Sequence, residues 1–359
     1  MADARFPLAI RPRPEAGPLA RLAAVLGGLV LGLAISVALL VGAGVEPSAL
    51  LDEFVLVFLA SPQSAASVLF QAEPLMFTGL AALLAFRARF WNIGIEGQMI
   101  AGAIIATAIT LLPGIPDPLR LPVMALGAAI GGMAWIALPA LLRLRLGVNE
   151  IITTLLLNYV ALNGLLWLLY GPWKDPVSGF PYSAEYTAAE RLPSLGWGRV
   201  DLALPLAILI ALAIAFLLAR SRFGFLLRFV EANPAASGAL GIDVTKVVLT
   251  AVLASGALAG LAGFVVSAGV EYRMTQSFFV GYGFSGILIA FLARNRPILA
   301  LVVALLVGLL MVGGQSMQVF YQIPGSMVQL IQAVLVITVA ASDFFVGHRI
   351  VLQRAEAAG

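Results

Sequence analysis

The stretch that decides the fold is residues 65–112, AASVLFQAEPLMFTGLAALLAFRARFWNIGIEGQMIAGAIIATAITLL. It holds two apolar runs, about 65–86 and 95–112, separated by a short segment with two arginines. An apolar helix of about 20 residues is long enough to cross a bilayer. Glu73 and Glu96 lie in these runs, where a charge costs roughly 2.5–3.5 kcal/mol on insertion scales. We therefore expect each carboxylate to face a protein interior, to line a wet path or to lie near the membrane surface.

The composition of the whole chain indicates a membrane protein. Of its 359 residues, 61% are hydrophobic and 11% are charged, and the mean hydropathy is +1.03. Soluble proteins are about 25% charged. A closed helical bundle satisfies its backbone hydrogen bonds inside lipid, and the alternating pattern of a membrane β-barrel is absent. The sequence thus predicts an all-α fold, a polytopic transmembrane helical bundle.

Ten hydrophobic spans are predicted along the chain. They cover about residues 22–43, 65–86, 95–112, 121–142, 151–170, 202–219, 247–270, 279–293, 297–314 and 325–345. The span 279–293 is short and rich in glycine, so a re-entrant or broken segment is the alternative there. The first span is longer than the 7–15 residues of a signal-peptide core, and we expect a retained helix. The apolar segment 50–60 is too short to cross, and we expect it to lie along the interface or pack on the bundle.

The distribution of basic residues predicts the topology. If the N-terminus is cytoplasmic, all but five of the 21 basic residues lie in inside segments. The five outside are Arg120, Lys174, Arg191, Arg199 and Arg273. Both termini should then be cytoplasmic. The predicted parts are a disordered N-terminal tail (1–20), a transmembrane domain (21–346) with an external loop at 171–200 and a cytoplasmic loop at 220–246, and a C-terminal tail (347–359).

The external loop is rich in aromatic residues, including Tyr186 and Trp197. Such residues commonly anchor a protein at the membrane interface. A docking surface for an extracytoplasmic partner is the alternative for this loop.

The residue types of the chain exclude several functions. Zero cysteines exclude disulfides, thiolate catalysis and Cys-ligated metal, and the one histidine, His348, lies beyond the last apolar run. Neither Lys174 nor Lys246 follows a glycine as in a phosphate-binding loop, so we expect no ATP site in this chain. The net charge of +3 is spread through the loops and does not indicate a nucleic acid polymer as partner. A membrane enzyme would need clustered acids, histidines or metal ligands, and we expect no catalytic residue, metal or bound cofactor.

A short helix is predicted in the loop 220–246. Asn233 can cap it, and Pro234 suits its first position. Ala235 and Ala236 are small enough to allow close approach by another protein, and Gly241 can end the helix in a left-handed turn. An ordinary loop helix is the alternative.

This loop resembles the coupling helix of ATP-binding-cassette importer permeases of the branched-chain amino acid and simple-sugar class. There a Gly-x-Asn-Pro-x-Ala-Ala-x-x-x-Gly-Ile pattern rests in a cleft of the ATPase subunit. The family commonly has glycine near the position of Glu231, where this sequence departs. The resemblance implies an ATPase contact through Glu231, Ala232, Asn233, Pro234, Ala235, Ala236 and Gly241.

Three further motifs resemble the nucleoside-type branch of these permeases, and the resemblance covers roughly residues 65–345. They are NIGIEGQM at 92–99, GVNEIITTLLLNY at 147–159 and GYGFSGI at 281–287. The resemblance implies a permease subunit of an ATP-driven importer that moves a small polar solute, preferably a nucleoside, by alternating access in the bacterial plasma (inner) membrane. A ribose-like sugar permease of the same class and an ion-coupled secondary transporter, with Glu73 as its best acid, are the alternatives.

The partners implied by the resemblance are all proteins. Separate ATP-binding-cassette ATPase subunits would hydrolyse the ATP. An extracytoplasmic substrate-binding lipoprotein would deliver the solute. A second permease subunit, preferably a homologue and otherwise a copy of this chain, would complete the path.

A neutral solute rich in hydroxyls needs hydrogen-bonding groups inside the bundle. The candidates for the substrate path are Asn92, Glu96, Gln98, Asn158 and Tyr159. Hydrogen bonding between helices is the alternative for each amide. For Glu96 the alternative is to accept backbone N–H groups freed by Gly94 and Gly97.

Three local arrangements are also expected. Asn158 and Asn163 point about 140° apart on one helix and cannot line one narrow pore. Glu150 should pair with Arg143 or Arg145, and an ATPase-side contact is the alternative. Gly256 and Gly260 are spaced for tight helix packing.

Overall fold

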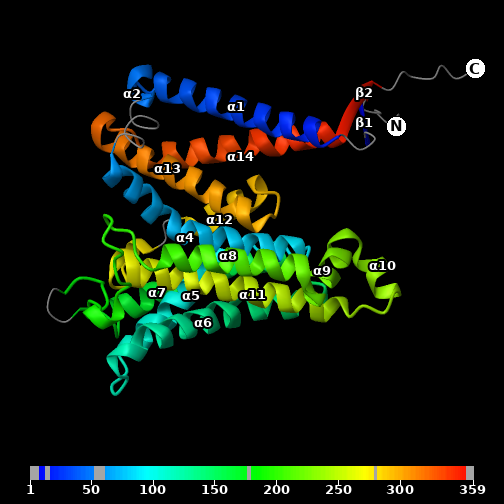
Figure 1. The fold of residues 1–359 in the computed structure, drawn as a ribbon. Coiled ribbons are helices and arrows are strands. Elements are labelled where there is room, and N and C mark those ends of the chain that lie inside the picture. Colours follow the sequence, from blue (N-terminus) through cyan, green and yellow to red (C-terminus); the bar gives the residue numbers. More distant parts are fainter. Residues whose placement is uncertain (1–7, 13–16, 52–60, 176–178, 279–280, 353–359) are drawn as a thin grey trace, which may run out of the picture. The chain divides into compact units, whose positions relative to one another are not determined.

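The computed structural model describes residues 8–12, 17–51, 61–175, 179–278 and 281–352, and it is drawn in Figure 1. The described residues are mainly helical, as predicted. The β-structure among the described residues is an antiparallel pair of strands, β1 (Leu8–Pro12) and β2 (His348–Leu352), and an isolated bridge between Ser194 and Asp201. The expectation of disorder throughout 1–20 is wrong for β1, because its backbone pairs with β2. The segment 52–60, which holds most of the predicted interfacial segment, lies outside the described residues.

The chain divides into two compact units, each described by itself. Unit 1 comprises Met1–Glu53 and Gly314–Gly359, and unit 2 comprises Phe54–Gly313. In unit 1, α1 (Pro18–Gly42) packs along α14 (Gly325–Gly347), and α2 (Pro47–Leu51) follows α1. Figure 1 shows α1 and α14 side by side. A Cβ atom at Gly28 would lie 2.7 Å from the Ser342 hydroxyl, so the glycine allows the two helices to approach closely.

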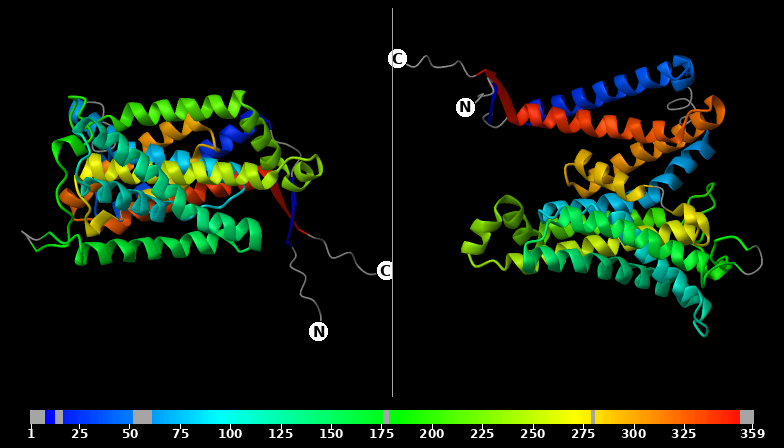
Figure 2. Two further views of the ribbon diagram at one scale, coloured as in Figure 1. Left: turned by 90° about the horizontal axis from the view of Figure 1, so that it is seen from below. Right: turned by 180° about the vertical axis from the view of Figure 1, so that it is seen from behind.

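Unit 2 contains the remaining helices. They are α4 (Pro62–Arg87), α5 (Ile95–Thr110), α6 (Asp117–Leu146), α7 (Glu150–Tyr170), α8 (Ala203–Arg220), α9 (Arg222–Ala232), α10 (Pro234–Ala239), α11 (Val244–Val265), α12 (Tyr282–Leu292) and the part of α13 (Pro297–Tyr321) up to Gly313. Short helices are η2 (Ala188–Glu190), the π-helix η3 (Val266–Glu271) and η4 (Gln276–Phe278). Within this unit, α10 and the loop between α7 and α8 lie at opposite ends, which we call the α10 end and the loop end (Figures 1 and 2).

Each predicted span overlaps a described apolar helix. Seven are long and apolar enough to cross a membrane: Pro62–Arg87, Asp117–Leu146, Glu150–Tyr170, Ala203–Arg220, Val244–Glu271, Pro297–Tyr321 and Gly325–Ser342. Three are shorter: Leu26–Gly42, Ile95–Thr110 and Gln276–Leu292. The count of ten crossings and the side on which the termini lie stay predictions.

Helix α4 forms the centre of unit 2. In the apolar stretch of α4, 89% of the residues are buried. The buried share of the corresponding stretch is 28% in α6, 22% in α7 and 28% in α8. The outward faces of α7 and α8 carry large apolar side chains such as Trp167 and Phe216. Apolar surface on this scale is typical of helices that contact lipid. The polar side chains of Glu73 and Thr78 on α4 are therefore buried in a protein interior.

Glycines bring α5, α6 and α11 into backbone contact. A Cβ at Gly260 of α11 would overlap the carbonyl oxygen of Ala128 in α6. A Cβ at Gly102 of α5 would lie 2.5 Å from the Cα of Gly260, and one at Gly132 would overlap the carbonyl oxygen of Gly256. This confirms the packing role predicted for Gly256 and Gly260.

Candidate functional site

Helix α5 begins inside unit 2, after a partly buried stretch of non-helical backbone, residues 90–94. Asn92 in this stretch exchanges two hydrogen bonds with Gln98 of α5: its Nδ2 donates to Gln98 Oε1 over 3.1 Å, and Gln98 Nε2 donates to Asn92 Oδ1 over 2.8 Å. The same Asn92 oxygen accepts the N–H of Gly94, and its Nδ2 also approaches Ser255 Oγ at 3.3 Å. The two amides thus stabilise the start of α5 and attach it to α11.

The opposite side of this stretch is held by α7. Asn158 Oδ1 accepts the N–H of Gly97 over 2.8 Å, and its Nδ2 donates to the carbonyl oxygen of Ile93 over 2.9 Å. Thr154 Oγ1 accepts the N–H of Ile93. Buried irregular backbone must have partners for its polar groups. The α7 side chains supply them here.

Glu96 joins the first turns of two helices. Its Oε1 accepts the N–H of Gly281 over 3.0 Å, and its Oε2 accepts that of Gly283, at the start of α12, over 2.6 Å. A Cβ at Gly283 would lie 2.7 Å from Oε2, so the glycine makes room for the carboxylate. Helix N-termini carry partial positive charge and favour an anion. Glu96 is 2% exposed, and it stabilises α5 and α12 at once.

The donors to Glu96 differ from those expected from the sequence. Gly94 donates to Asn92 and Gly97 donates to Asn158, so the prediction that these two glycines serve Glu96 is wrong. The carboxylate turns away from its own helix start and reaches α12. Sequence spacing could not reveal this, because Gly281 lies 185 positions away.

Helix α12 is too short to cross a bilayer alone. It has 11 residues, about 16 Å at 1.5 Å per residue, roughly half of a hydrocarbon core of about 30 Å. The π-helix η3 and the short η4 precede it, and Tyr272 between them has φ of 56°. The broken alternative for 279–293 therefore fits the described residues.

The structure brings four of the five path candidates together. Asn92, Glu96, Gln98 and Asn158 are all buried around the start of α5, and we call these four residues the polar cluster. Tyr159 is 60% exposed on another face of α7 and lies apart from it. Asn163 is also exposed, as the predicted angle from Asn158 requires. Whether any of them meets a solute stays a prediction.

The short helix α10 has the predicted construction. Asn233 Oδ1 accepts the N–H of Ala236 over 3.1 Å, Pro234 is its first residue, and Gly241 has φ of 80°. Ala235 and Ala236 are exposed. The helix therefore presents small side chains to a partner, and its actual contact with an ATPase stays a prediction.

Two ion pairs lie at the α10 end of the described residues. Glu150 is 3.1 Å from Arg143, which confirms the predicted local ion pair. Glu231 pairs with Arg87 at the end of α4, and sequence reasoning missed this pair because 144 positions separate the two residues.

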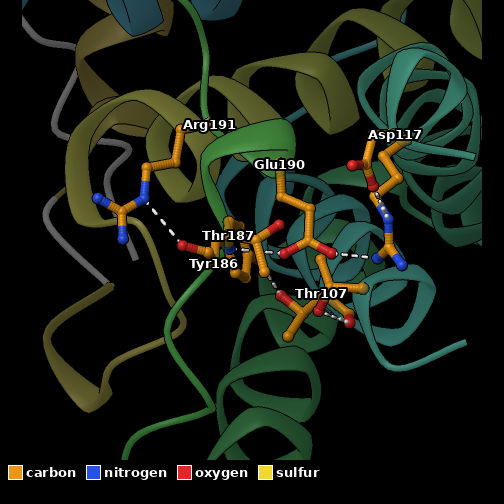
Figure 3. A network of polar contacts seen from close by, with 8 residues as sticks. Thr107, Asp117, Tyr186, Thr187, Glu190 and Arg191 are labelled. Atoms are coloured by element: carbon orange, nitrogen blue, oxygen red, sulfur yellow. Dashed lines mark hydrogen bonds and ion pairs between the residues drawn. The ribbon is translucent and has the colours of Figure 1, made fainter.

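A polar network fixes the described part of the loop between α7 and α8, residues 179–202, at the loop end (Figure 3). The buried hydroxyl of Tyr186 contacts that of Thr107 in α5, and the buried Glu190 pairs with Arg120 of α6. Glu190 also accepts the N–H of Thr187 in a capping box. Burial raises the pKa of Tyr186 to about 12.

The aromatic residues of this loop have different environments. Tyr186 is 1% exposed, so the expectation that it anchors the membrane interface is wrong: its ring is enclosed by protein. Trp197 is 45% exposed, and its indole N–H donates to the carbonyl oxygen of Pro62.

Among the described residues, no group of three or more His, Cys, Asp or Glu could hold a metal ion.

Unit 2 is a bundle of apolar helices. Two of them, α5 and α12, begin inside it, among polar groups that have hydrogen-bond partners. Such interrupted helices are typical of membrane transport proteins. The chain belongs to the family described as branched-chain amino acid transport system / permease component, whose model matches residues 64–340. It is a permease of the ATP-binding-cassette importer class, as the sequence motifs indicated.

Curated relatives agree with this assignment. A glucose ABC transporter permease protein of Haloferax volcanii is 34% identical over 332 residues, covering 89% of this chain and 87% of the relative. A guanosine ABC transporter permease protein of Bacillus subtilis is 33% identical over 277 residues, covering 76% and 79%. A second guanosine permease protein of that organism is 29% identical over 293 residues, covering 79% and 91%. No solved structure matches the chain.

Proposed function

We propose that this chain is the transmembrane permease subunit of an ATP-driven importer that moves nucleosides by alternating access. The observation that carries the proposal is the meeting of the α5 and α12 first turns at Glu96. Interrupted helices in transporters commonly mark the solute site, because backbone and amide groups become available there. A guanosine permease protein 33% identical to the chain supports a nucleoside. The glucose permease protein of Haloferax volcanii supports a sugar as the second candidate.

The path would run beside the polar cluster. Asn92, Gln98 and Asn158 bond to one another or to backbone in this conformation. A ribose hydroxyl could exchange with these bonds when the helices separate, because each amide both donates and accepts. Tyr159 would meet the solute only if the path followed the exposed face of α7.

The energy would enter at α10. In this proposal the α10 end and both termini are cytoplasmic, and residues 21–346 form the permease domain in a bacterial plasma membrane. ATPase subunits that hydrolyse ATP would bind Ala235 and Ala236. A substrate-binding lipoprotein would dock at the loop end, where the polar network holds residues 179–202 in place.

A second permease subunit would complete the transporter. Two different guanosine permease proteins of Bacillus subtilis resemble this chain, which favours a pair of homologous subunits over two identical ones. Co-purification from native membranes with identification of the attached chains tests this directly. A complex with one kind of permease subunit would reverse the preference.

The test of the whole proposal is uptake by the purified complex in proteoliposomes. Labelled guanosine should accumulate only with ATP inside the vesicles, and excess unlabelled nucleosides should compete better than glucose. Better competition by glucose would transfer the assignment to sugars. Uptake that persists without ATP and collapses with the proton gradient would replace it with ion coupling.

The role of α10 has its own test. Replacing Ala235 or Ala236 by tryptophan should lower the solute moved per ATP while leaving membrane insertion intact. Ala213→Trp is the matched control, because Ala213 is an exposed alanine on α8, away from α10. Wild-type transport by the α10 variants would exclude this helix as the ATPase contact.

A further inference from the structure

The end of α4 is fastened to the junction between α9 and α10. Arg87 is the last residue of α4, and its Nε and Nη2 lie 3.1 and 3.0 Å from Glu231 Oε2. Arg89, two residues later, donates from Nε to the carbonyl oxygen of Glu231 over 2.7 Å and from Nη2 to that of Ala232 over 2.8 Å. Two guanidinium groups from one segment thus hold two successive residues of α9.

These contacts lie at the C-terminal end of α9, where the carbonyl groups have no partner within the helix. Ala232 is the last residue of α9, and Asn233 both ends α9 and caps α10. The last carbonyl oxygens of a helix have no partner within it and carry partial negative charge. A guanidinium group that donates to two of them is therefore a favourable cap. Arg89 reaches them from a left-handed backbone conformation, with φ of 54°.

Helix α4 in turn contacts α12 closely. A Cβ at Gly286 of α12 would lie 2.6 Å from the Cβ of Thr78 in α4. A Cβ at Gly79 of α4 would lie 2.5 Å from Cγ2 of Ile289 in α12. Neither helix can slide far past the other without steric overlap. The first turn of α12 donates to Glu96, so the contacts continue to the polar cluster.

We propose that Arg87 and Arg89 are positioning residues that transmit a movement of α10 through α4 to α12 and the Glu96 cluster. The inference rests on the proposed function, in which an ATPase moves α10. Helix α11 follows α10 in the chain and receives such a movement through the backbone. Arg87, the last residue of α4, is 144 positions from Glu231, and α4 is joined to the junction by these side-chain contacts.

The link also gives Glu231 a role. Here the carboxylate is 34% exposed and pairs with Arg87, whose side chain is 17% exposed. In this proposal the Glu231 carboxylate therefore contacts α4 and supplies the negative charge that binds Arg87.

The test measures solute moved per ATP hydrolysed by the complete transporter in proteoliposomes. Arg87→Gln, Glu231→Gln and Arg89→Gln should each keep ATP hydrolysis and lower this ratio by about fivefold or more, the low end of coupling between protein sites. The exchange Arg87→Glu with Glu231→Arg should restore it, because the ion pair is re-formed. Arg143→Gln is the matched control, since it breaks another ion pair at the α10 end and should keep the ratio.

A second measurement does not depend on the exchange folding well. The chain has no cysteine, so Arg87→Cys with Glu231→Cys introduces a single reactive pair. A short thiol-specific cross-linker should restore the ratio that the untreated double variant has lost. A merely structural role would leave the treated and untreated proteins equally coupled.

The outcomes separate the link from the proposed function. If the wild-type complex shows no ATP-dependent uptake, both are overturned. If Ala236→Trp uncouples the complex and the arginine variants keep the wild-type ratio, the link alone is wrong. Failure of both the charge exchange and the cross-linker to restore coupling would also overturn it.

Discussion

Asp201 donates its backbone N–H to the carboxylate of Glu73 over 3.2 Å, so two buried acids lie in contact at the loop end of unit 2. They are 3% and 0% exposed. Asp201 Oδ1 accepts the N–H of Ala203 at the start of α8. Within the described residues, Glu73 Oε2 and Asp201 Oδ2 have no hydrogen-bond partner. A Cβ at Gly269 of the π-helix would lie 2.5 Å from that Asp201 oxygen, so little space is left around it.

The first prediction concerns the pH dependence of stability. Burial raises the pKa of Asp201 above its ordinary value, although the N–H of Ala203 opposes the shift. The folded state then holds the proton more tightly than the unfolded chain, whose pKa is about 3.9. This group's contribution to stability is therefore complete below that value and is lost as pH rises through the folded-state pKa. Asp201→Asn should flatten the fall of Tm with pH, measured by thermal unfolding in detergent.

The control for this prediction is Asp243→Asn. Asp243 also caps a helix, through the N–H of Lys246, but it is exposed. It should retain the wild-type dependence of Tm on pH. An unchanged dependence in Asp201→Asn would show that Asp201 does not titrate in this range.

The second prediction concerns the buried hydroxyl of Tyr186. Tyr186→Phe removes its contact with Thr107 and should cost about 1 kcal/mol of stability. Residues 179–202 should also be cut faster by protease, because this contact holds them to α5. Tyr170→Phe is the control: its hydroxyl bonds to Gln276 at an exposed site and should contribute less. Equal protease resistance of wild type and Tyr186→Phe would contradict the prediction.

The third prediction concerns the backbone contact between α6 and α11. Gly260→Ala places a methyl group on the carbonyl oxygen of Ala128, and relief of the overlap should cost about 1–3 kcal/mol. Gly164→Ala in α7 meets nothing within 4 Å, and it should raise stability by up to about 1 kcal/mol through helix propensity. Thermal unfolding of both variants gives the comparison. Similar Tm values for the two would mean that the helices separate freely.

The fourth prediction distinguishes two roles for Glu96. Glu96→Gln turns one acceptor into an amide donor that faces a backbone N–H. An unsatisfied buried group costs about 1–3 kcal/mol, so Tm and uptake should both fall. Glu150→Gln breaks a partly exposed ion pair instead and should cost no more than about 1 kcal/mol. If Glu96→Gln keeps its Tm and only raises the KM for solute, the carboxylate contacts solute and does not stabilise the helices.

Local sequence patterns predicted the local structure well. The apolar runs gave the helices, because burial in lipid or protein requires length and hydrophobicity in one stretch. Asn233 before Pro234 gave the cap of α10, and the spacing of Arg143 and Glu150 gave an ion pair. In each case the partners lie within a few residues, so chain geometry alone limits the possible contacts.

Contacts between distant segments could not be predicted in the same way. Tyr186 meets Thr107 across 79 positions, and Glu231 meets Arg87 across 144. A single sequence does not say which helices become neighbours. The wrong donors for Glu96 have the same origin, because proximity along the chain favoured its own glycines over those before α12.

The close contact between Glu96 and Gly283 limits how these two positions can change during evolution. A side chain at position 283 would overlap the Glu96 carboxylate. Aspartate at position 96 would be too short to reach the N–H groups of Gly281 and Gly283, which would lose their hydrogen-bond partner. Neither position can mutate alone without a penalty. Among divergent lineages the two should therefore change together or not at all, a signature that comparative genetics can read without a transport assay.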